Sequence, residues 1–119
     1  MTMEQQQQKI YIADPMRGKK EFNFPAFFEA EWRLMERGYT VFNPARNDLQ
    51  NGVKVEGTEG ELDELPDFDL KKAMDINCQA ICNCDAIYLL EGWSGSAGAN
   101  VESELAMLLS LDMLYQVDD

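Results

Sequence analysis

The chain has 119 residues, of which 45% are hydrophobic and 10% aromatic, a composition that predicts one small folded domain rather than a disordered chain. Its 10 basic and 22 acidic residues give a net charge of −12, which argues against binding to polymeric DNA or RNA, because such binding needs a basic surface. It contains no histidine, which excludes imidazole acid–base chemistry and histidine metal sites.

The sequence predicts a flexible, Gln-rich tail over residues 1–8 and a single domain over residues 9–119. The mainly apolar run from Lys9 to Ala13 predicts a first strand, and residues 14–20 predict a polar loop. Residues 39–42 predict a second strand, which the pair Asn43-Pro44 closes.

A helix is predicted between these two strands. Asn23 or Phe24 is expected to cap it, Pro25 suits its first turn, and Gly38 marks its end. Its apolar residues recur at helical spacing, with Glu31 at the edge of the apolar face. The residues expected on that face are Phe27, Phe28, Trp32, Leu34 and Met35.

The rest of the chain alternates helices and strands. Residues 45–65 form an acidic segment without a clear period, which predicts a loop that is functional or mobile. Residues 66–83 and 101–110 predict helices, and residues 86–90 and 113–117 predict strands. This alternation predicts an α/β fold of three layers, flavodoxin-like or Rossmann-like, with a small parallel sheet of four to five strands.

In such folds, ligands bind beyond the carboxyl ends of the strands, where the strand order reverses. If the order is 2-1-3-4, the loops over residues 14–20 and 91–99 face each other. One crevice would then hold Arg17, Ser96 and Glu102.

Residues 92–102 join the third strand to the next helix through small residues, whose backbone N–H groups and hydroxyls suit an anion. Glu102 falls in the first turn of that helix, beside the loop. It is either a functional carboxylate or an acidic residue favoured near a helix N-terminus. Trp93 is either a loop anchor packed on the core or a wall for a base or sugar.

The three cysteines, Cys78, Cys82 and Cys84, are expected to be small buried side chains near the end of a helix, in a reducing compartment. A metal site would need a further ligand, and no second Cys/His cluster exists, so no metal is expected. The polar N-terminus and the absence of a long apolar stretch favour a cytoplasmic protein without membrane contact.

Several segments in order resemble the nucleoside 2-deoxyribosyltransferase superfamily, and most closely its small branch often found in phages and prophages. The resemblance spans most of residues 9–110. The matching segments are Tyr11-Ile12-Ala13-Asp14-Pro15-Met16-Arg17-Gly18, Asn23-Phe24-Pro25-Ala26-Phe27, Gly38-Tyr39-Thr40-Val41-Phe42-Asn43-Pro44-Ala45, Cys84-Asp85-Ala86-Ile87-Tyr88-Leu89-Leu90, and Gly92-Trp93 with Ser96, Gly98-Ala99 and Glu102.

The resemblance implies cleavage of an N-glycosidic bond without a cofactor. Glu102 matches the glutamate that attacks the anomeric carbon, and Tyr11 matches the tyrosine that orients it. A carboxylate suits this chemistry because it can trap an oxocarbenium-like centre as an ester. Water then completes hydrolysis, or a second base completes transfer.

The resemblance also implies a (deoxy)nucleoside 5′-monophosphate as substrate. Ser96 stands where relatives acting on free nucleosides carry an acidic residue, and a neutral hydroxyl tolerates a phosphate. Arg17 matches a position near that phosphate. The remaining positions implied in substrate binding are Asp14, Gly18, Trp93, Gly98 and Ala99.

Two positions depart from the family pattern. Asp14 stands where the family usually has glycine. Asn77 falls on the register of a family aspartate that handles the leaving base, and Asp75 could serve instead if the helix register shifts.

An alternative to an enzyme is a non-catalytic nucleotide binder of phage origin that sequesters a nucleotide in the host cytoplasm. A weaker alternative is an acidic protein-interaction domain.

The resemblance also implies an oligomer, because relatives assemble as oligomers. A homodimer or larger is expected, with the C-terminal residues 115–119 as candidate contributors to a neighbouring pocket. The base, the sugar, the choice between hydrolysis and transfer, and the oligomer size stay open.

Overall fold

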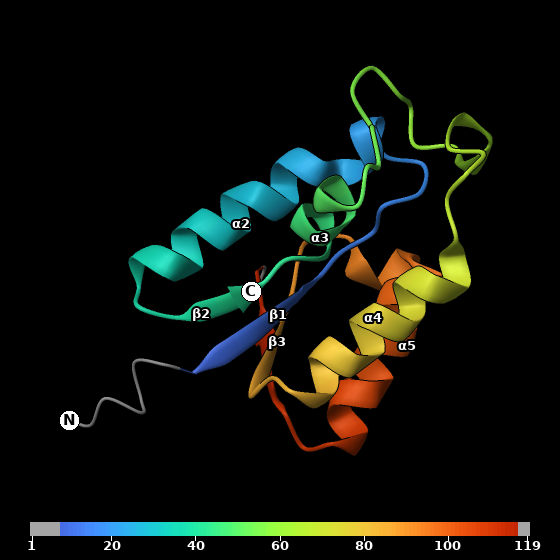
Figure 1. Cartoon of the computed structure of the whole chain (residues 1–119). Coiled ribbons are helices and arrows are strands. Elements are labelled where there is room, and N and C mark those ends of the chain that lie inside the picture. The colour runs from blue at the N-terminus through green and yellow to red at the C-terminus, as the bar shows by residue number, and fades with distance from the viewer. Residues whose placement is uncertain (1–7, 117–119) are drawn as a thin grey trace.

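The computed structural model describes residues 8–116, and its centre is a parallel sheet of four strands (Figure 1). The strands are β1 (Lys9–Ala13), β2 (Thr40–Phe42), β3 (Ala86–Leu89) and β4 (Asp112–Tyr115). Their order is β2-β1-β3-β4, and every neighbouring pair is parallel. The predicted α/β fold with a small parallel sheet is therefore confirmed, with the strand order that brings the loops after β1 and β3 together.

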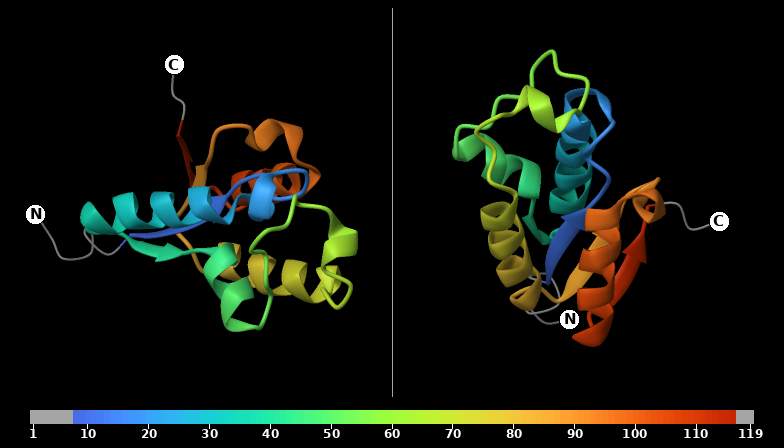
Figure 2. Two further views of the ribbon diagram at one scale, coloured as in Figure 1. Left: turned by 90° about the horizontal axis from the view of Figure 1, so that it is seen from above. Right: turned by 90° about the vertical axis from the view of Figure 1, so that its right-hand side faces the viewer.

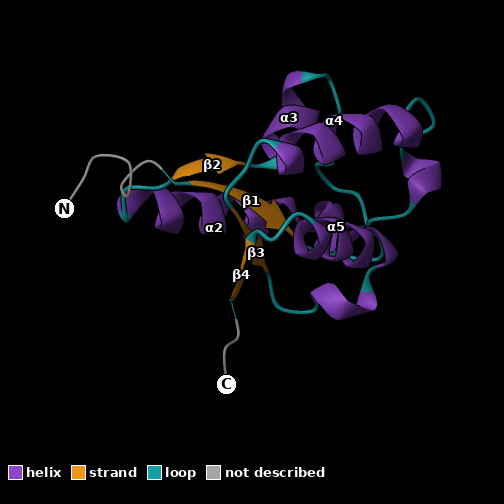
Figure 3. Ribbon diagram, turned by 90° about the horizontal axis from the view of Figure 1, so that it is seen from below, coloured by secondary structure: helices purple, strands orange, loops and turns teal. Residues whose placement is uncertain are grey.

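Helices cover both faces of the sheet in the three-layer arrangement of a Rossmann-like fold. They are α2 (Phe24–Glu36), α3 (Pro44–Gln50), α4 (Leu70–Cys82) and α5 (Ala97–Leu108). Figures 2 and 3 show α2 and α4 on opposite sides of the sheet. Within residues 8–116, no helix has the length and apolar character needed to cross a membrane.

The first strand connects two hydrophobic cores. Ile10 and Ile12 pack into the core beneath α2, whereas Tyr11 and Ala13 pack into the core beneath α4 and α5. Successive side chains of a strand point to opposite faces, so a strand buried on both faces must be apolar throughout. This is why the short run from Ile10 to Ala13 forms the centre of the sheet.

The segment 45–65, predicted as a loop, begins with a helix. Asn43 caps α3, because its side-chain oxygen accepts a hydrogen bond of 2.9 Å from the Ala45 N–H. Pro44 fits the first turn, where its missing N–H costs nothing. The Asn-Pro pair therefore ends one element and starts the next, which explains why the helix was missed.

The main differences in element boundaries are at two helix starts and at one strand end. The helix α4 begins at Leu70 instead of residue 66, because the Asp69 carboxylate caps it at the Lys72 N–H, 3.1 Å away. The helix α5 begins at Ala97 instead of residue 101. Strand β4 ends at Tyr115, and the predicted end at residue 117 lies outside the described residues.

The apolar face of α2 is narrower than predicted. Phe27 and Leu34 are buried, but Trp32 is 61% and Met35 is 56% exposed, so the prediction was wrong for these two. Trp32 follows Phe27 by five residues, which places it roughly 140° around the helix. Glu31, expected at the edge, is buried on this helix.

Polar partners explain the burial of Glu31. Its Oε1 accepts a hydrogen bond of 2.9 Å from the Asn43 side-chain amide, and Arg46 Nε lies 3.0 Å from Oε2. A buried charge requires such compensation. The contacts tie α2 to the start of α3 and so hold one wall of the candidate site.

The predicted tail is described only at its last residue. Gln8 joins the sheet, since its carbonyl oxygen accepts a hydrogen bond of 3.1 Å from the Thr40 N–H and its amide donates to Asp112 at 3.0 Å. Residues 1–7 lie outside the described residues.

Candidate active site

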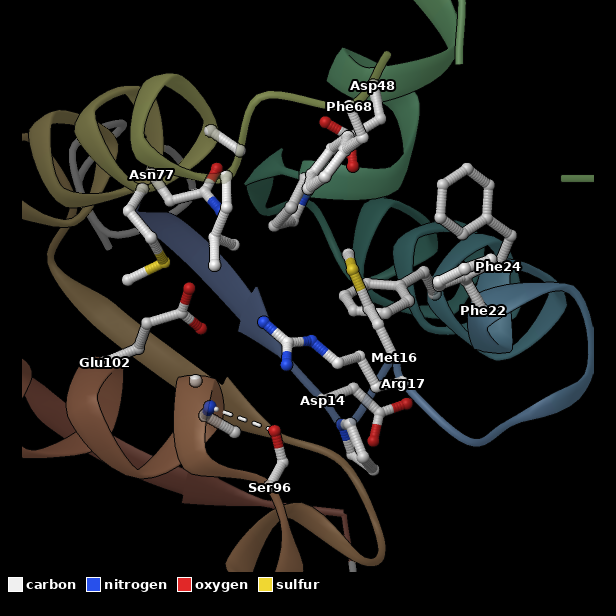
Figure 4. Close-up of a pocket in the computed structure, with 18 of the residues that line it drawn as sticks. Asp14, Met16, Arg17, Phe22, Phe24, Asp48, Phe68, Asn77, Ser96 and Glu102 are labelled. Atoms are coloured by element: carbon white, nitrogen blue, oxygen red, sulfur yellow. Dashed lines mark hydrogen bonds between the residues drawn. The ribbon is translucent and has the colours of Figure 1, made fainter. Parts of the chain in front are cut away.

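A pocket of about 270 Å³ lies beyond the carboxyl ends of β1 and β3, where the strand order reverses. Parallel α/β sheets bind ligands at this point because the neighbouring loops diverge there. The loop after β1, the helices α3 and α4, and the start of α5 contribute its walls (Figure 4). Its polar side chains are Asp14, Arg17, Asp48, Asn77, Ser96 and Glu102.

The centre of the site is a buried tyrosine–glutamate pair from β1 and α5. The Tyr11 hydroxyl donates a hydrogen bond of 2.9 Å to Oε2 of Glu102, across 91 positions of sequence. Tyr11 is 0% exposed and Glu102 is 7% exposed. The tyrosine therefore fixes one carboxylate oxygen, and the Glu102 side chain still lines the pocket.

Burial controls the protonation of this pair. It raises the pKa of Glu102 to about 7, and hydrogen bonds from Tyr11 and Asn77 act in the opposite direction. Burial, with the nearby Glu102 charge, also raises the pKa of Tyr11 well above its ordinary value. The tyrosine thus remains a hydrogen-bond donor, and the carboxyl group changes charge near neutral pH.

The start of α5 forms the second wall. Ser96 caps the helix, with its hydroxyl oxygen accepting a hydrogen bond of 3.2 Å from the Ala99 N–H, drawn as a dashed line in Figure 4. Gly98 and Ala99 also line the pocket. An α-helix N-terminus carries a partial positive charge and free N–H groups, so this wall favours an anionic group.

Arg17 supplies the pocket's cation from the loop after β1. Figure 4 shows its guanidinium directed into the pocket, toward Glu102. Arg17, Ser96 and Glu102 thus line one pocket, as the sequence predicts. A guanidinium beside a helix N-terminus suits a phosphate or carboxylate ligand.

Asp14 lies on the pocket wall just after β1, with its side chain nearly closed to water. One carboxylate oxygen accepts a hydrogen bond from the Asn23 amide, and the other has no partner within residues 8–116. Burial raises the pKa of Asp14 to about 7, and Lys19 and Asn23 lower it in part. The side chain fills space that a glycine would leave free.

An unusual backbone turn supports this contact. Glu21, Phe22 and Asn23 all have positive φ, from 53° to 65°, a conformation that costs energy for residues other than glycine. The turn buries Phe22 in the pocket wall and aims the Asn23 amide at Asp14 and at the Pro15 carbonyl oxygen, 3.0 Å away.

The structure decides between two candidate positions on α4. Asn77 lines the pocket on the same side as Glu102 and helps to lower the pKa of that carboxyl group. Asp75 is exposed and accepts a hydrogen bond of 2.9 Å from Gln79 one turn later. Two residues along a helix turn a side chain by roughly 200°, so only one of the two can face the pocket. Asp75 therefore does not line the pocket.

Two predicted substrate-binding residues do not line the pocket. The Gly18 N–H donates to the Gly60 carbonyl oxygen at 2.9 Å and so joins two surface loops. Trp93 packs against the core beneath α5, with its ring centroid 6.1 Å from that of Tyr115. Trp93 is therefore a loop anchor rather than a wall for a ligand.

One polar residue of the pocket, Asp48, was not predicted from the sequence. Asp48 lies on α3 and lines the pocket, and burial raises its pKa to about 6. The segment that follows contributes apolar wall residues. These apolar wall residues are Val53, Val55, Leu62, Leu65 and Phe68. Recognising Asn43-Pro44 as a helix start would have placed Asp48 on a helix facing the sheet.

The cysteines differ from one another in burial. Only Cys84 is buried, and burial raises its pKa to about 11. Cys78 is half-buried near Glu102, and Cys82 is exposed, so the expectation of three buried side chains was wrong. Cys82 is the last residue of α4, and on this helix it is Ile81 that is buried.

A carboxylate–tyrosine pair thus lies at the switch point of a Rossmann-like sheet. The comparison with curated proteins found no match to this chain. A family model described as "Domain of unknown function (DUF4406)" matches residues 8–115, which include every strand and helix that the structure describes and all the pocket residues. The chain therefore belongs to the DUF4406 family.

Proposed function

We propose that this protein cleaves the N-glycosidic bond of a (deoxy)nucleoside 5′-monophosphate, with Glu102 as nucleophile. The observation that carries the proposal is the 2.9 Å hydrogen bond from Tyr11 to Glu102 beside an anion-binding helix start. The resemblance to the nucleoside 2-deoxyribosyltransferase superfamily agrees with it, because both residues match positions with these roles.

The chemistry follows from the positions of these groups. A carboxylate oxygen of ionised Glu102 attacks the anomeric carbon, a C–O bond forms, and the C–N bond breaks with its electron pair going to the base. The Tyr11 hydrogen bond holds the other oxygen, so the attacking oxygen has a fixed direction. Water or a second base then displaces Glu102 from the sugar.

The phosphate would be bound at the start of α5. The N–H groups there, the Ser96 hydroxyl and the Arg17 guanidinium form one polar wall. A phosphate held at this wall leaves the sugar beside Glu102 and directs the base toward the apolar walls from α3 and the segment after it (Figure 4). No group in this scheme requires a metal or an organic cofactor.

The test is base release from a panel of ribo- and deoxynucleoside monophosphates, followed by chromatography. We expect Glu102→Gln to lower the rate at least about a hundredfold, because the amide cannot form the ester. Glu104→Gln is the matched control, since Glu104 is exposed on the same helix and should retain full activity. Base release that survives Glu102→Gln would refute the proposal.

A second candidate is a non-catalytic nucleotide binder, for example one that sequesters a nucleotide during phage infection. Asn77 favours it, because an amide at the pocket face of α4 cannot donate a proton to a leaving base as a carboxylic acid would. Recovery of intact nucleotide from the protein, with no base released, would support this candidate over the enzyme.

We also propose that the protein forms a homodimer or larger oligomer in the cytoplasm. Exposed apolar side chains on α5 and in the turn after it support this, since large apolar groups in water favour association. The exposed apolar side chains are Val101, Met107, Leu108 and Leu109. Sedimentation velocity would test the proposed oligomer, and a monomer at micromolar concentration would refute it.

A further inference from the structure

A carboxylate stands at the end of the pocket opposite the anion-binding wall. Figure 4 shows Asp48 beside Phe68, on the far side of the pocket from Ser96 and Glu102. Asp48 comes from α3, so it approaches the pocket independently of the two loops that the strand order brings together.

The Asp48 carboxylate has no hydrogen-bond or ion-pair partner within residues 8–116. The interactions formed by this residue involve its backbone carbonyl, which accepts hydrogen bonds from the Asn51 and Val53 N–H groups. Asp48 is half-buried, and a ligand that displaces the remaining water from its carboxylate must supply a partner in its place, because a polar group removed from water without a partner is costly. The unpaired carboxylate thus points to a hydrogen-bond donor on the ligand.

The surroundings of Asp48 suit a flat aromatic ring. Phe68 lies beside Asp48 in Figure 4, Leu65 and Val53 line the same pocket, and further phenyl rings come from the residues around the start of α2. The cation of the pocket, Arg17, is directed toward Glu102 and is not among the groups that shift the pKa of Asp48. A ring with N–H groups on its edge would stack on the apolar walls and donate to the carboxylate.

Resting on the proposed function, we infer that Asp48 selects the base. It accepts a hydrogen bond from an exocyclic amino group, so the preferred substrates are nucleotides of amino-bearing bases rather than of their oxo counterparts. At the exocyclic position an ionised carboxylate can only accept a hydrogen bond, which an amino group donates and an oxo group cannot, and the ring N–H of an oxo base lies on the neighbouring ring atom instead. The role is one of specificity, distinct from the attack by Glu102.

The protonation state is consistent with acceptance. Burial raises the pKa of Asp48 to about 6, so the group is mainly ionised at pH 7.5. A donor in the pocket would stabilise this ionised form further, because a hydrogen bond to the charged form lowers the pKa.

The experiment compares two matched pairs of deoxynucleoside monophosphates, in which an amino group replaces an oxo group: cytosine with uracil, and adenine with hypoxanthine. Affinity is measured by calorimetry in the Glu102→Gln background, where the nucleotide stays intact, and base release is measured with Glu102 present. We expect the protein to favour the amino partner at least about tenfold. Asp48→Asn should reduce this ratio at least about tenfold, since the amide can also donate to an oxo group.

Asp67→Asn is the control, because it makes the same charge change at an exposed position. Thermal unfolding confirms that each variant folds. An equal preference in the unaltered protein, or a ratio unchanged by Asp48→Asn, would overturn the inference. Selective binding without any base release would support the inference while refuting the proposed N-glycosidase activity.

Discussion

The Tyr11 hydroxyl and the Glu102 carboxylate meet 2.9 Å apart, although one lies on the first strand and the other on the last helix. Both side chains are buried, so neither can turn away without losing its partner. The parallel pairing of β1 with β3 produces this contact, because α5 starts from the loop that follows β3. The relationship leads to a direct prediction about proton affinity.

Removing the Tyr11 hydroxyl should make Glu102 a weaker acid. The hydrogen bond from Tyr11 favours the ionised carboxylate, so Tyr11→Phe should raise the pKa of Glu102 above its present value of about 7. Carbon-detected NMR titration of the Glu102 carboxyl measures this. The control is Tyr88→Phe, a half-buried tyrosine of β3. An unshifted titration in Tyr11→Phe would contradict the assigned contact.

Stability should fall as the pH rises from about 5 to 8. Burial raises the pKa of Asp14 and Glu102 to about 7 and that of Asp48 to about 6, above the values expected in the unfolded chain. The folded state therefore binds more protons than the unfolded state in this window, and the free energy of unfolding decreases with pH. Urea unfolding at successive pH values tests this.

The variant Asp14→Asn should flatten that pH dependence, because it removes one of the raised carboxyl groups. The control Asp67→Asn removes an exposed carboxyl group and should leave the slope as it is. A free energy of unfolding that increases between pH 5 and pH 8 would show that these groups are not protonated in the folded protein.

Ser96 should determine the choice between a phosphorylated and a free nucleoside. Ser96→Asp keeps a capping residue at the start of α5 and adds a negative charge at the proposed phosphate wall. We expect the ratio of kcat/KM for the monophosphate over the free nucleoside to fall at least about tenfold, through charge repulsion. Ser94→Asp, an exposed position in the preceding turn, is the comparison. An unchanged ratio of kcat/KM would show that the phosphate does not bind at this wall.

The buried Glu31 should matter far more for stability than a surface charge of the same helix. Glu31→Ala removes the acceptor for Asn43 and Arg46 and should cost about 1–3 kcal/mol in the free energy of unfolding. Glu29→Ala breaks the exposed ion pair with Arg33 and should cost less than about 0.5 kcal/mol. Equal costs in chemical denaturation would contradict this difference.

Gly60 should tolerate no side chain. A Cβ there would lie 2.2 Å from the Lys19 carbonyl oxygen, in the loop whose Gly18 N–H bonds Gly60. Gly52 has nearly the same φ, +92° against +90°, but open space around it. Gly52→Ala should therefore cost about 1 kcal/mol through backbone strain alone, and Gly60→Ala clearly more. Melting temperatures of the two variants compare the effects, and a Gly60→Ala that melts no lower than Gly52→Ala would show that the two loops are not in contact.

Local patterns in the sequence determined the four strands, three of the four α-helices and the class of fold, whereas α3 was missed. Short apolar strands alternating with amphipathic helices permit few arrangements other than a parallel sheet covered on both faces, and small residues before Glu102 indicated a loop at a helix start. These signals depend only on residues close together in sequence, so they can be identified without knowledge of the rest of the chain. The same patterns left element ends uncertain where capping residues, such as Asp69 and Ser96, decide them.

Only the tertiary structure decided which side chains share the pocket. Asn77 faces Glu102 and Asp75 does not, and Asp48 enters from a short helix that packing holds in place. The contact between Tyr11 and Glu102 spans 91 positions of sequence, and that between Asn43 and Glu31 joins two different helices across 12 positions. Such contacts depend on burial and on the strand order of the whole sheet, and these are properties of the folded chain that no local run of residues contains.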